Sequence, residues 1–366
     1  MVSMTFWRGK RVLITGHTGF KGSWMALWLQ MLGAELVGYS LEPPTEPNLF
    51  TLAAVAKNMK SVIADVGNRY LLCETLQAFQ PDIVFHMAAQ SLVRAAYLDP
   101  VETYASNVMG TVHLFEAIRQ TNTVRAVINI TSDKCYENNE WCWGYREHDR
   151  LGGHDPYSNS KACAELVTSA YRDSYFRAMQ IGLASVRAGN VIGGGDWAAD
   201  RLIPDMMRAF VNNESVPIRN PNALRPWQYV LEPLSGYLLL AERLYQSPLA
   251  FAESWNFGPN ERDVKPVKWV VDFFGQYLER RDAWYQDAAN HPHEAQSLKL
   301  DCSKALLRLG WQPRLDLEKG LAVTARWYRA YLAKENMRDV SLLHIKDYMN
   351  QTTNTRELCD DSTKIS

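Results

Sequence analysis

An apolar run, a glycine-rich turn and a helical pattern follow one another near the start of the chain. Residues 11–15 (RVLIT) predict a buried strand, and residues 16–22 (GHTGFKG) follow at once. Trp24, Leu27, Trp28 and Met31 then recur at helical spacing until Gly33. Because glycines allow a tight turn and a helix N-terminus offers unpaired N–H groups, this unit predicts a dinucleotide-binding turn. The spacing is G-x-x-G-x-x-G, and the alternative is a glycine-rich turn without a ligand.

Further apolar runs alternate with helical stretches along the first half of the chain. Residues 36–40, 61–65, 82–89 and 125–131 predict additional buried strands. Strands that alternate with helices and are apolar on both faces indicate a parallel sheet. We therefore expect an α/β fold with a Rossmann-type, doubly wound parallel sheet.

The organisation changes after residue 190. Residues 202–210, 232–245 and 265–278 predict helices, and residues 225–230 predict a strand. We expect residues 1–190 to bind a dinucleotide and carry the catalytic residues. Residues 191–334 should form a smaller substrate-binding domain, with minor exchange of strands between the two. Residues 335–366 should form a polar tail.

Polar and glycine-rich clusters follow the predicted strands. They comprise residues 16–22, Asp65, residues 86–90 and residues 132–134. In doubly wound sheets the ligand binds beyond the carboxyl ends of the strands, so these clusters should meet at one site.

Tyr157 and Lys161 are four residues apart, which places them on one face of a helix. The pKa of a free phenol is about 10, and a nearby ammonium group favours the phenolate. The pair therefore predicts an acid/base for interconverting an alcohol and a ketone. Such a spacing also arises by chance, so the interpretation depends on the surrounding motifs.

Composition excludes several other classes of protein. The net charge is −1, with 39 basic and 40 acidic residues, so the chain lacks the excess of basic residues that is typical of proteins that bind nucleic acid. Six scattered cysteines form no zinc-site or disulfide pattern and are typical of a reducing compartment. No apolar run approaches the roughly 18 residues that span a bilayer. A strand that begins at residue 11 leaves no room before it for a signal peptide, so we expect none. We expect a cytoplasmic protein with no metal site and no membrane partner.

The motif Gly16-x-x-Gly19-x-x-Gly22 occurs together with Asn107, Ser132 and the Tyr157/Lys161 pair. This combination resembles the extended short-chain dehydrogenase/reductase family from about residue 9 to about residue 333. Residues 17–24, 131–134 and 189–197 are similar to the nucleotide-sugar 4,6-dehydratase group, above all to its branch that acts on CDP-glucose. The resemblance implies an NAD-dependent hydro-lyase that forms a 4-keto-6-deoxy sugar for O-antigen lipopolysaccharide, with relatives that pair as homodimers or homotetramers.

The resemblance also implies site residues. The catalytic candidates are Ser132, Asp133, Lys134, Tyr157 and Lys161. The expected NAD contacts, besides Tyr157 and Lys161, are Gly16, His17, Thr18, Gly19, Phe20, Lys21, Gly22, Ser40, Asp65, Val66, Ala88, Ala89, Gln90 and Asn107. The expected contacts to the nucleotide diphosphate sugar are Asn190, Arg201, Arg225 and His293.

Some of these residues leave alternatives open. Lys134 stands where related dehydratases carry the glutamate to which the base role is given. It acts either as the base at carbon 5, which requires a lowered pKa, or as an electrostatic holder. His293 either approaches a phosphate or caps a turn. An acidic residue at the end of the second strand usually binds the adenosine ribose of NAD, and an arginine there suits the 2′-phosphate of NADP. This strand ends at Ser40 with neither, and we expect NAD rather than NADP.

Two other functions are compatible with part of the pattern. A nucleotide-sugar 4-epimerase shares the glycine loop, Tyr157 and Lys161, but has no need of an acid and a base beside Ser132. A non-catalytic dinucleotide-sensing protein on the same fold usually lacks the tyrosine and lysine. Asp133 and Lys134 therefore favour the dehydratase, whereas the nucleotide of the donor rests on resemblance alone.

Overall fold

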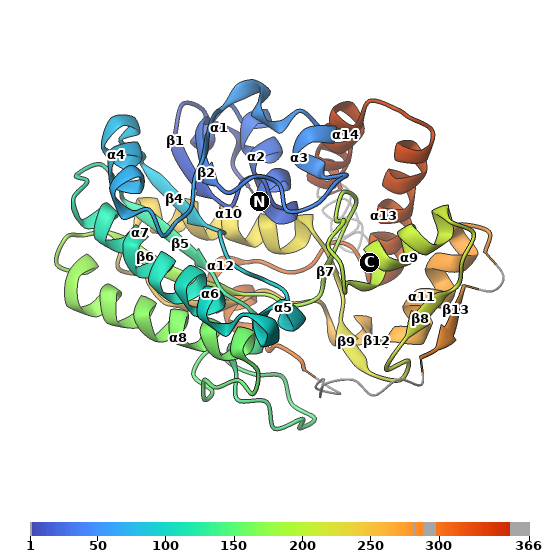
Figure 1. The fold of residues 1–366 in the computed structure, drawn as a ribbon. Coiled ribbons are helices and arrows are strands. Elements are labelled where there is room, and N and C mark those ends of the chain that lie inside the picture. The colour runs from blue at the N-terminus through green and yellow to red at the C-terminus, as the bar shows by residue number, and fades with distance from the viewer. Residues whose placement is uncertain (1, 281–282, 288–297, 352–366) are drawn as a thin grey trace, which may run out of the picture.

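The computed structural model describes residues 2–280, 283–287 and 298–351, and a seven-stranded parallel sheet organises them (Figure 1). The strand order is β11-β6-β5-β4-β1-β2-β3. The strands are β1 (Arg11–Thr15), β2 (Glu35–Ser40), β3 (Lys60–Ile63), β4 (Ile83–His86), β5 (Ala126–Ile130), β6 (Gly182–Arg187) and β11 (Ser254–Asn256). Since the strand order reverses between β1 and β4, the loop after β1 lies where ligands of such sheets bind. The expected doubly wound α/β fold is confirmed.

Helices cover both faces of the sheet because its strands are apolar on both sides. In β1, Val12 and Ile14 belong to one buried cluster and Leu13 to the other. The first face packs against α2 (Phe20–Met31) and α10 (Leu231–Gln246), and the second against α4 (Arg69–Phe79) and α7 (Gly110–Arg119). Helix α8 (Pro156–Tyr171) lies beside α7. The shorter helices of this part are α1 (Met4–Trp7), α3 (Leu49–Leu52), α5 (Val93–Leu98) and α6 (Pro100–Tyr104).

A smaller part of the molecule, at the right of Figure 1, contains short two-stranded sheets and helices. Its elements are β7 (Val191–Ile192), α9 (Leu202–Val211), β8 (Val216–Ile218), β9 (Leu224–Pro226), β10 (Gln228–Tyr229), β12 (Val264–Pro266), α11 (Val267–Tyr277) and β13 (Trp284–Gln286). The strand predicted over residues 225–230 is two strands, because β9 pairs with β12 whereas β10 pairs with β7.

The two parts are not separated at residue 190. Strand β11 pairs with β6 in the large sheet, and α10 packs against β5 and β6. The chain therefore leaves the large sheet after β6, builds part of the smaller unit and returns. This is a greater exchange than the minor one we expected.

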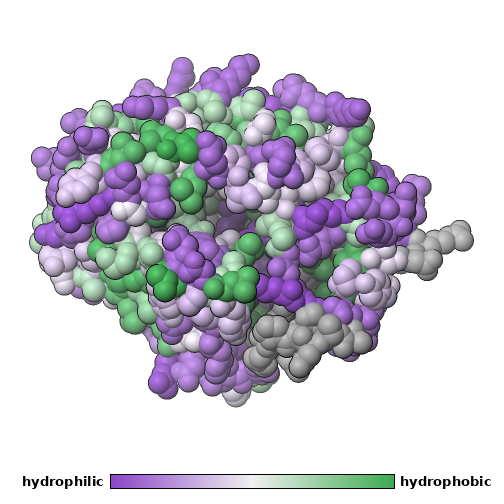
Figure 2. Space-filling view, in the orientation of Figure 1, coloured by the Kyte–Doolittle hydropathy of each residue, from purple (hydrophilic) through white to green (hydrophobic). Residues whose placement is uncertain are grey.

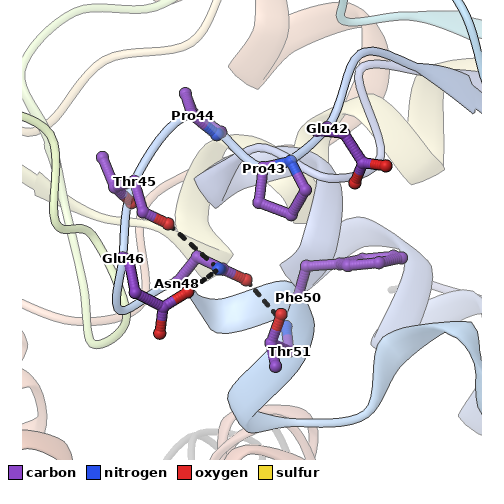
Figure 3. Close-up of a pocket in the computed structure, with 8 residues that line it drawn as sticks. All are labelled: Glu42, Pro43, Pro44, Thr45, Glu46, Asn48, Phe50 and Thr51. Atoms are coloured by element: carbon purple, nitrogen blue, oxygen red, sulfur yellow. Dashed lines mark hydrogen bonds between the residues drawn. The ribbon is translucent and has the colours of Figure 1, made fainter.

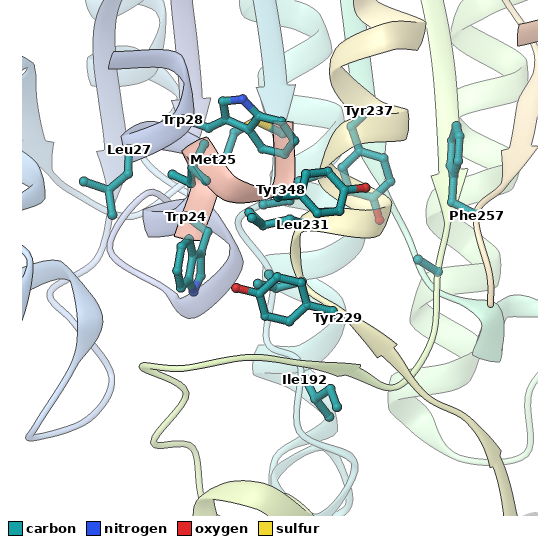
Figure 4. Packing of buried hydrophobic residues seen from close by; sticks show 14 of the residues in the cluster. Trp24, Met25, Leu27, Trp28, Ile192, Tyr229, Leu231, Tyr237, Phe257 and Tyr348 are labelled. Carbon is teal, nitrogen blue, oxygen red and sulfur yellow. The ribbon is translucent and has the colours of Figure 1, made fainter. Parts of the chain in front are cut away.

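The expected polar tail over residues 335–366 is wrong for its first half. Residues 317–350 form α13 (Leu317–Leu332) and α14 (Met337–Asn350), after the short α12 (Ser303–Leu309). Helix α14 begins at the cap Asn336 and buries Ile345 and Tyr348. Tyr348 packs edge-on against Trp28 of α2, with ring centroids 5.7 Å apart (Figure 4). Residues 352–366 lie outside the described residues.

Within the described residues, no helix combines the length and apolar character that crossing a bilayer requires. The face drawn in Figure 2 carries mostly hydrophilic side chains, with hydrophobic ones in separate groups.

Candidate active site

The tyrosine and lysine of the site lie on the first turns of α8. The carboxylate of Asp155 caps this helix by accepting a hydrogen bond from Ser158 N at 2.9 Å, and Pro156 follows at the first helical position. Tyr157 and Lys161 are both buried, with 8% and 6% of their surface exposed. Lys161 Nζ donates to the carbonyl of Ile130 at 3.2 Å, which ties the helix to the end of β5.

The protonation of this pair differs from the sequence-based expectation. Burial raises the pKa of Tyr157 to about 12, although a hydrogen bond with Ser132 opposes the rise. Burial lowers the pKa of Lys161 to about 7, and the charge of Lys21 contributes. The predicted lowering of the phenol pKa is therefore wrong for the protein's own residues, because burial outweighs the hydrogen bond of Ser132 and the charge of Arg201.

Ser132, Asp133 and Lys134 occupy a tight 3₁₀ turn directly after β5. Ser132 Oγ accepts from Lys134 N at 3.2 Å and donates to Asp133 Oδ1 at 3.0 Å. Asp133 is buried, which raises its pKa, and a Cβ atom at Gly189 would lie 1.7 Å from its Oδ2. Lys134 is exposed and lines the cleft described below. The turn thus presents a buried carboxyl group with a raised pKa and an exposed lysine side chain.

The glycine loop is as compact as its sequence predicts. Gly16 has φ of +76°, and a Cβ atom there would lie 2.7 Å from Ala88 N. A Cβ atom at Gly22 would lie 2.0 Å from the Gly16 carbonyl oxygen. Side chains at these positions would fill the cradle between the loop and the end of β4. The cradle and the N-terminus of α2, which is capped at Gly19, fit a dinucleotide pyrophosphate.

Two side chains of this loop face the sheet rather than the cleft. The ring of His17 is buried, with Nε2 2.7 Å from Ser61 Oγ, and a Cβ atom at Gly38 would collide with it at 2.2 Å. Thr18 Oγ1 lies 2.8 Å from Ser40 Oγ and donates to the Leu41 carbonyl. A cofactor contact by His17 must therefore come from its backbone.

The end of β2 opens onto a shallow pocket of about 520 Å³, shown in Figure 3. It is lined by Glu42, Pro43, Pro44, Thr45, Glu46, Asn48, Phe50 and Thr51. Two carboxylates therefore lie near the strand end that carries Ser40, a feature that the sequence analysis did not use.

The next strand exits carry the remaining cofactor candidates. Asp65 Oδ1 accepts from Gly67 N at 2.6 Å, and Val66 is buried beside Gly110. Ala88 N donates to Thr15 Oγ1 at 3.1 Å, and Ala89 follows in the same loop. These groups end the strands on either side of the glycine loop, as predicted.

Asn107 connects that loop to the catalytic helix. It lies in a π-helical turn, Ala105–Met109, and its side chain both accepts from Gln90 N and donates to the Gln90 carbonyl, each at 2.9 Å. Asn107 Nδ2 also donates to Ser160 Oγ at 2.8 Å. The observed role of Asn107 is therefore to hold the β4 loop against α8.

A cleft of about 620 Å³ lies between the two parts of the molecule. Its lining includes Phe20, Lys21, Ser132, Asp133, Lys134, Tyr157, Asn190, Arg201 and Arg225. Arg201 pairs with Asp196 at 2.9 Å and donates to Ser91 Oγ at 3.1 Å. The charge of Arg225 is close enough to lower the pKa of Asp133 against the effect of burial. His293 lies outside the described residues.

An ion pair beneath the site was missed by the sequence analysis. Glu165 and Arg187 are buried and 2.7 Å apart, and Glu165 also accepts from Thr131 and Ser185 at 2.5 and 2.7 Å. Burial works against ionisation, but Arg187 holds the pKa of Glu165 at about 2. Glu165 follows Lys161 by one helical turn, and that spacing was the signal available. Among the described residues, no group of three or more His, Cys, Asp or Glu side chains is placed to hold a metal ion.

Comparisons with known proteins agree with this geometry. Residues 13–324 match the GDP-mannose 4,6 dehydratase family. The chain is 54% identical over 358 residues to a CDP-glucose 4,6-dehydratase of Salmonella typhimurium, covering 96% of this chain and 100% of that protein. It is 26% identical over 335 residues to a dTDP-glucose 4,6-dehydratase of Xanthomonas campestris, covering 86% and 92%.

Solved structures show the same fold. A dTDP-glucose 4,6-dehydratase from Streptomyces venezuelae with bound NAD superposes with a TM-score of 0.77 at 22% identity, covering 89% of this chain and 98% of that one. A UDP-glucose 4-epimerase from Thermotoga maritima superposes with a TM-score of 0.77 at 20% identity, covering 88% of this chain and 99% of that one. Since an epimerase superposes equally well, the fold does not distinguish the two reactions.

Proposed function

The chain belongs to the GDP-mannose 4,6 dehydratase family, and from this premise we propose that it catalyses the 4,6-dehydration of CDP-D-glucose. The products are CDP-4-keto-6-deoxy-D-glucose and water. The observation that carries the proposal is the 54% identity, over nearly the whole chain, to an enzyme of that name. The protein is accordingly a hydro-lyase that uses NAD.

When bound, NAD would supply the acceptor for the hydride of carbon 4 and the donor of the hydride to carbon 6. The chain's own residues move the protons. Tyr157 accepts the proton of the 4-hydroxyl group, which requires the phenolate, and Ser132 is placed to hydrogen-bond the same oxygen. Lys161 would hold the nicotinamide ribose and, in its ammonium form, would place a positive charge beside the tyrosine.

The elimination step needs an acid for the leaving hydroxyl at carbon 6 and a base for the hydrogen at carbon 5. Asp133 fits the acid because burial raises its pKa and thereby favours the protonated carboxyl group. Lys134 lines the same cleft and is the nearest candidate in sequence for the base. Its side chain is exposed, which also fits the alternative role of an electrostatic holder.

The residues at the adenosine end favour NAD over NADP. Gly16, Gly19 and Gly22 form the cradle for the pyrophosphate, and Ser40 lies at the end of β2 near the expected ribose. Glu42, which lines the pocket of Figure 3 beside that strand end, would repel a 2′-phosphate. Asp65 and Val66 lie at the next strand exit, where the adenine is expected.

The nucleotide sugar is expected across the cleft, against the smaller part of the molecule. Arg225 on β9 and Asn190 beside β7 line this side and can bind the pyrophosphate. Arg201 already pairs with Asp196, so its use for a phosphate requires that this ion pair rearrange. His293 remains a candidate from the sequence alone.

We propose that the protein is a cytoplasmic homodimer or homotetramer that serves O-antigen lipopolysaccharide synthesis. Helices α5, α6 and α8 expose large apolar side chains, among them Leu98, Val101 and Leu166. Such a face is typical of an interface between subunits. The cysteines of the described residues are free thiols, which fits a reducing compartment.

Mass spectrometry of products from CDP-, dTDP-, UDP- and GDP-glucose tests the proposal. We expect a product lighter by one water from CDP-glucose and slower reaction with the other donors. A product of unchanged mass would indicate a 4-epimerase, for which Asp133 and Lys134 are unnecessary. Loss of water from another donor would indicate a different nucleotide-sugar dehydratase. Binding of NAD without turnover of any donor would indicate a sensing protein.

A further inference from the structure

A buried carboxylate lies on the same helix as the catalytic pair. Glu165 follows Lys161 by one turn of α8, so the two side chains share one face of the helix. Its Oε2 accepts from Arg187 and Ser185, each at 2.7 Å, and its Oε1 accepts from Thr131 at 2.5 Å. Well-packed apolar residues often stabilise a fold as much as a buried ion pair does. An ion pair at this position therefore indicates a role beyond packing.

Thr131 joins this carboxylate to the end of β5, where the catalytic turn begins. Thr131 is buried and stands between two contributors to the site, because Lys161 Nζ bonds the carbonyl of Ile130 and Ser132 follows. The bond from Thr131 to Glu165 therefore ties both the acceptor of Lys161 and the Ser132 hydroxyl group to α8. Since small misplacements of catalytic groups lower rates strongly, this bond bears on the reaction itself.

The charges around Lys161 show what the carboxylate adds. The titratable groups near it are Lys21 of α2, His86 of β4, Cys135 of the turn after β5, and Tyr157 and Glu165 of α8. Burial lowers the pKa of His86 to about 3 and raises that of Cys135 well above its ordinary value, so both are neutral at pH 7. Tyr157 keeps its proton, also because of burial. Of these described groups, Glu165 is therefore the one that carries a negative charge, and it opposes the lowering of the Lys161 pKa.

We propose that Glu165 is a positioning residue for oxidation at carbon 4: through Thr131 it fixes the strand exit that carries Ser132, and it places a negative charge one helical turn from Lys161. This inference rests on the proposed dehydratase function. Burial would raise the pKa of Glu165, but Arg187 holds it at about 2, so the carboxylate stays ionised. A glutamate that only attached α8 to the sheet would affect stability, and its loss would leave the rate and pH profile of a folded variant unchanged.

The first test measures how fast reduced nicotinamide forms when the NAD-bound enzyme is mixed with CDP-glucose. Thr131→Val keeps the shape of the side chain but removes its hydroxyl group, and with it the bonds to Glu165 and to the Val186 carbonyl. We expect the rate to fall about tenfold, as for the loss of one hydrogen bond, while NAD affinity by calorimetry stays unchanged. Thr131→Ser, which keeps the hydroxyl group, should recover the rate. Thr121→Val is the matched control, because it removes an equally buried hydroxyl group that bonds a carbonyl of α7.

The second test isolates the charge. The amide oxygen of Glu165→Gln can still accept from Thr131, but the negative charge is gone. The pKa of Lys161 should then fall below about 7, so its ammonium form is lost at lower pH. The rate of reduced nicotinamide formation should accordingly begin to fall at a lower pH than in the parent. In Thr131→Val, which keeps the charge, the rate should be lower at every pH without a shift of the profile.

The results that would overturn the inference are distinct from failure of the proposed function. A folded Glu165→Gln with the pH profile of the parent, or Thr131→Val with the rate of the parent, would overturn the inference and leave the proposed function standing. An equal fall in Thr131→Ser and Thr131→Val would also overturn it. If circular dichroism shows that Glu165→Gln does not fold, the two Thr131 variants decide the inference. A parent that forms reduced nicotinamide with none of the nucleotide-glucose donors would overturn the proposed function, and the inference with it.

Discussion

Proton positions at single residues decide what this site can do. With its pKa raised to about 12, Tyr157 holds its proton at neutral pH, whereas Lys161, lowered to about 7, is close to losing one. Oxidation at carbon 4 needs the reverse, a phenolate beside an ammonium. The nucleotide sugar is an anion, so the positive charge that brings down the pKa of Tyr157 would have to come from the oxidised nicotinamide ring.

Tyr157→Phe removes the proton acceptor and keeps the ring, so folding should be unaffected. We expect turnover to fall about 10²- to 10⁴-fold, the usual contribution of a general base. Stopped-flow absorbance should show no reduced nicotinamide after mixing with CDP-glucose. Tyr171→Phe is the control, because Tyr171 lies at the far end of the same helix and bonds Glu116. Turnover above about a tenth of the parent rate would contradict the role of Tyr157.

Lys134→Met should separate elimination from oxidation. Neither Lys134 nor Asp133 is needed for oxidation at carbon 4, so reduced nicotinamide should form and accumulate while dehydration falls steeply. In deuterated water, the parent should place one solvent deuterium at carbon 5, and the Lys134 variant should show little. Asp133→Asn should still allow exchange at carbon 5 but not loss of the hydroxyl. Exchange at the parent rate in Lys134→Met would assign the base to another residue, with Tyr157 tested first.

At the scale of elements, the predictions succeeded where one physical signal dominated. Strands β1 to β5 came from continuous apolar runs, and the structure has them within a few residues. Tyr157 and Lys161 lie on one helix, α8, as their spacing indicated. Helix α14 was missed because few apolar side chains, such as Ile345, mark its buried face among many polar ones. The Glu165–Arg187 pair was missed because its partners lie on different elements and meet only where α8 packs against β6.

Glu165→Gln should destabilise the fold by leaving Arg187 buried without a counter-charge. Breaking such a pair costs about 3–5 kcal/mol of the free energy of unfolding. Glu116→Gln, in a more exposed pair with Arg119, should cost much less, because solvent screens that pair. The pKa of Glu165 is about 2 when folded, below its ordinary 4.5. Its contribution is therefore complete above pH 4.5 and is lost as pH falls toward 2. Urea unfolding at several pH values measures the free energy of unfolding of both variants. An equal decrease in Glu165→Gln and Glu116→Gln would contradict the prediction.

Ile345→Ala tests whether α14 is part of the folded core. Ile345 is fully buried on α14, so truncation should cost about 2–5 kcal/mol of the free energy of unfolding. Leu343→Ala, on the same helix, is the matched control, because 54% of Leu343 is exposed. Tryptophan fluorescence during urea unfolding reports the difference, since Trp28 lies beside Tyr348 of this helix. Two variants of equal stability would mean that α14 does not contribute to the core in solution.

At the scale of the whole molecule, the arrangement of the two parts follows from pairing that no local pattern reveals. Strand β11 has three residues, and its place beside β6 is fixed by hydrogen bonds rather than by an apolar run. The cleft forms because the chain crosses between the two parts several times. Arg225 and Tyr157, from the two parts, therefore line one cavity, and the resemblance identified both although composition did not.

The assembly of subunits provides the last prediction. Leu98 and Val101 are 88% and 77% exposed at the junction of α5 and α6, and α8 lies beside both helices. If this face pairs two subunits, Leu98→Asp combined with Val101→Asp should produce monomers, because two charges would be buried without partners. Analytical ultracentrifugation measures the mass. Leu307→Asp, on α12 and 82% exposed, is the control that should leave assembly unchanged. An assembly that survives the double change, or a parent that is monomeric, would contradict this interface.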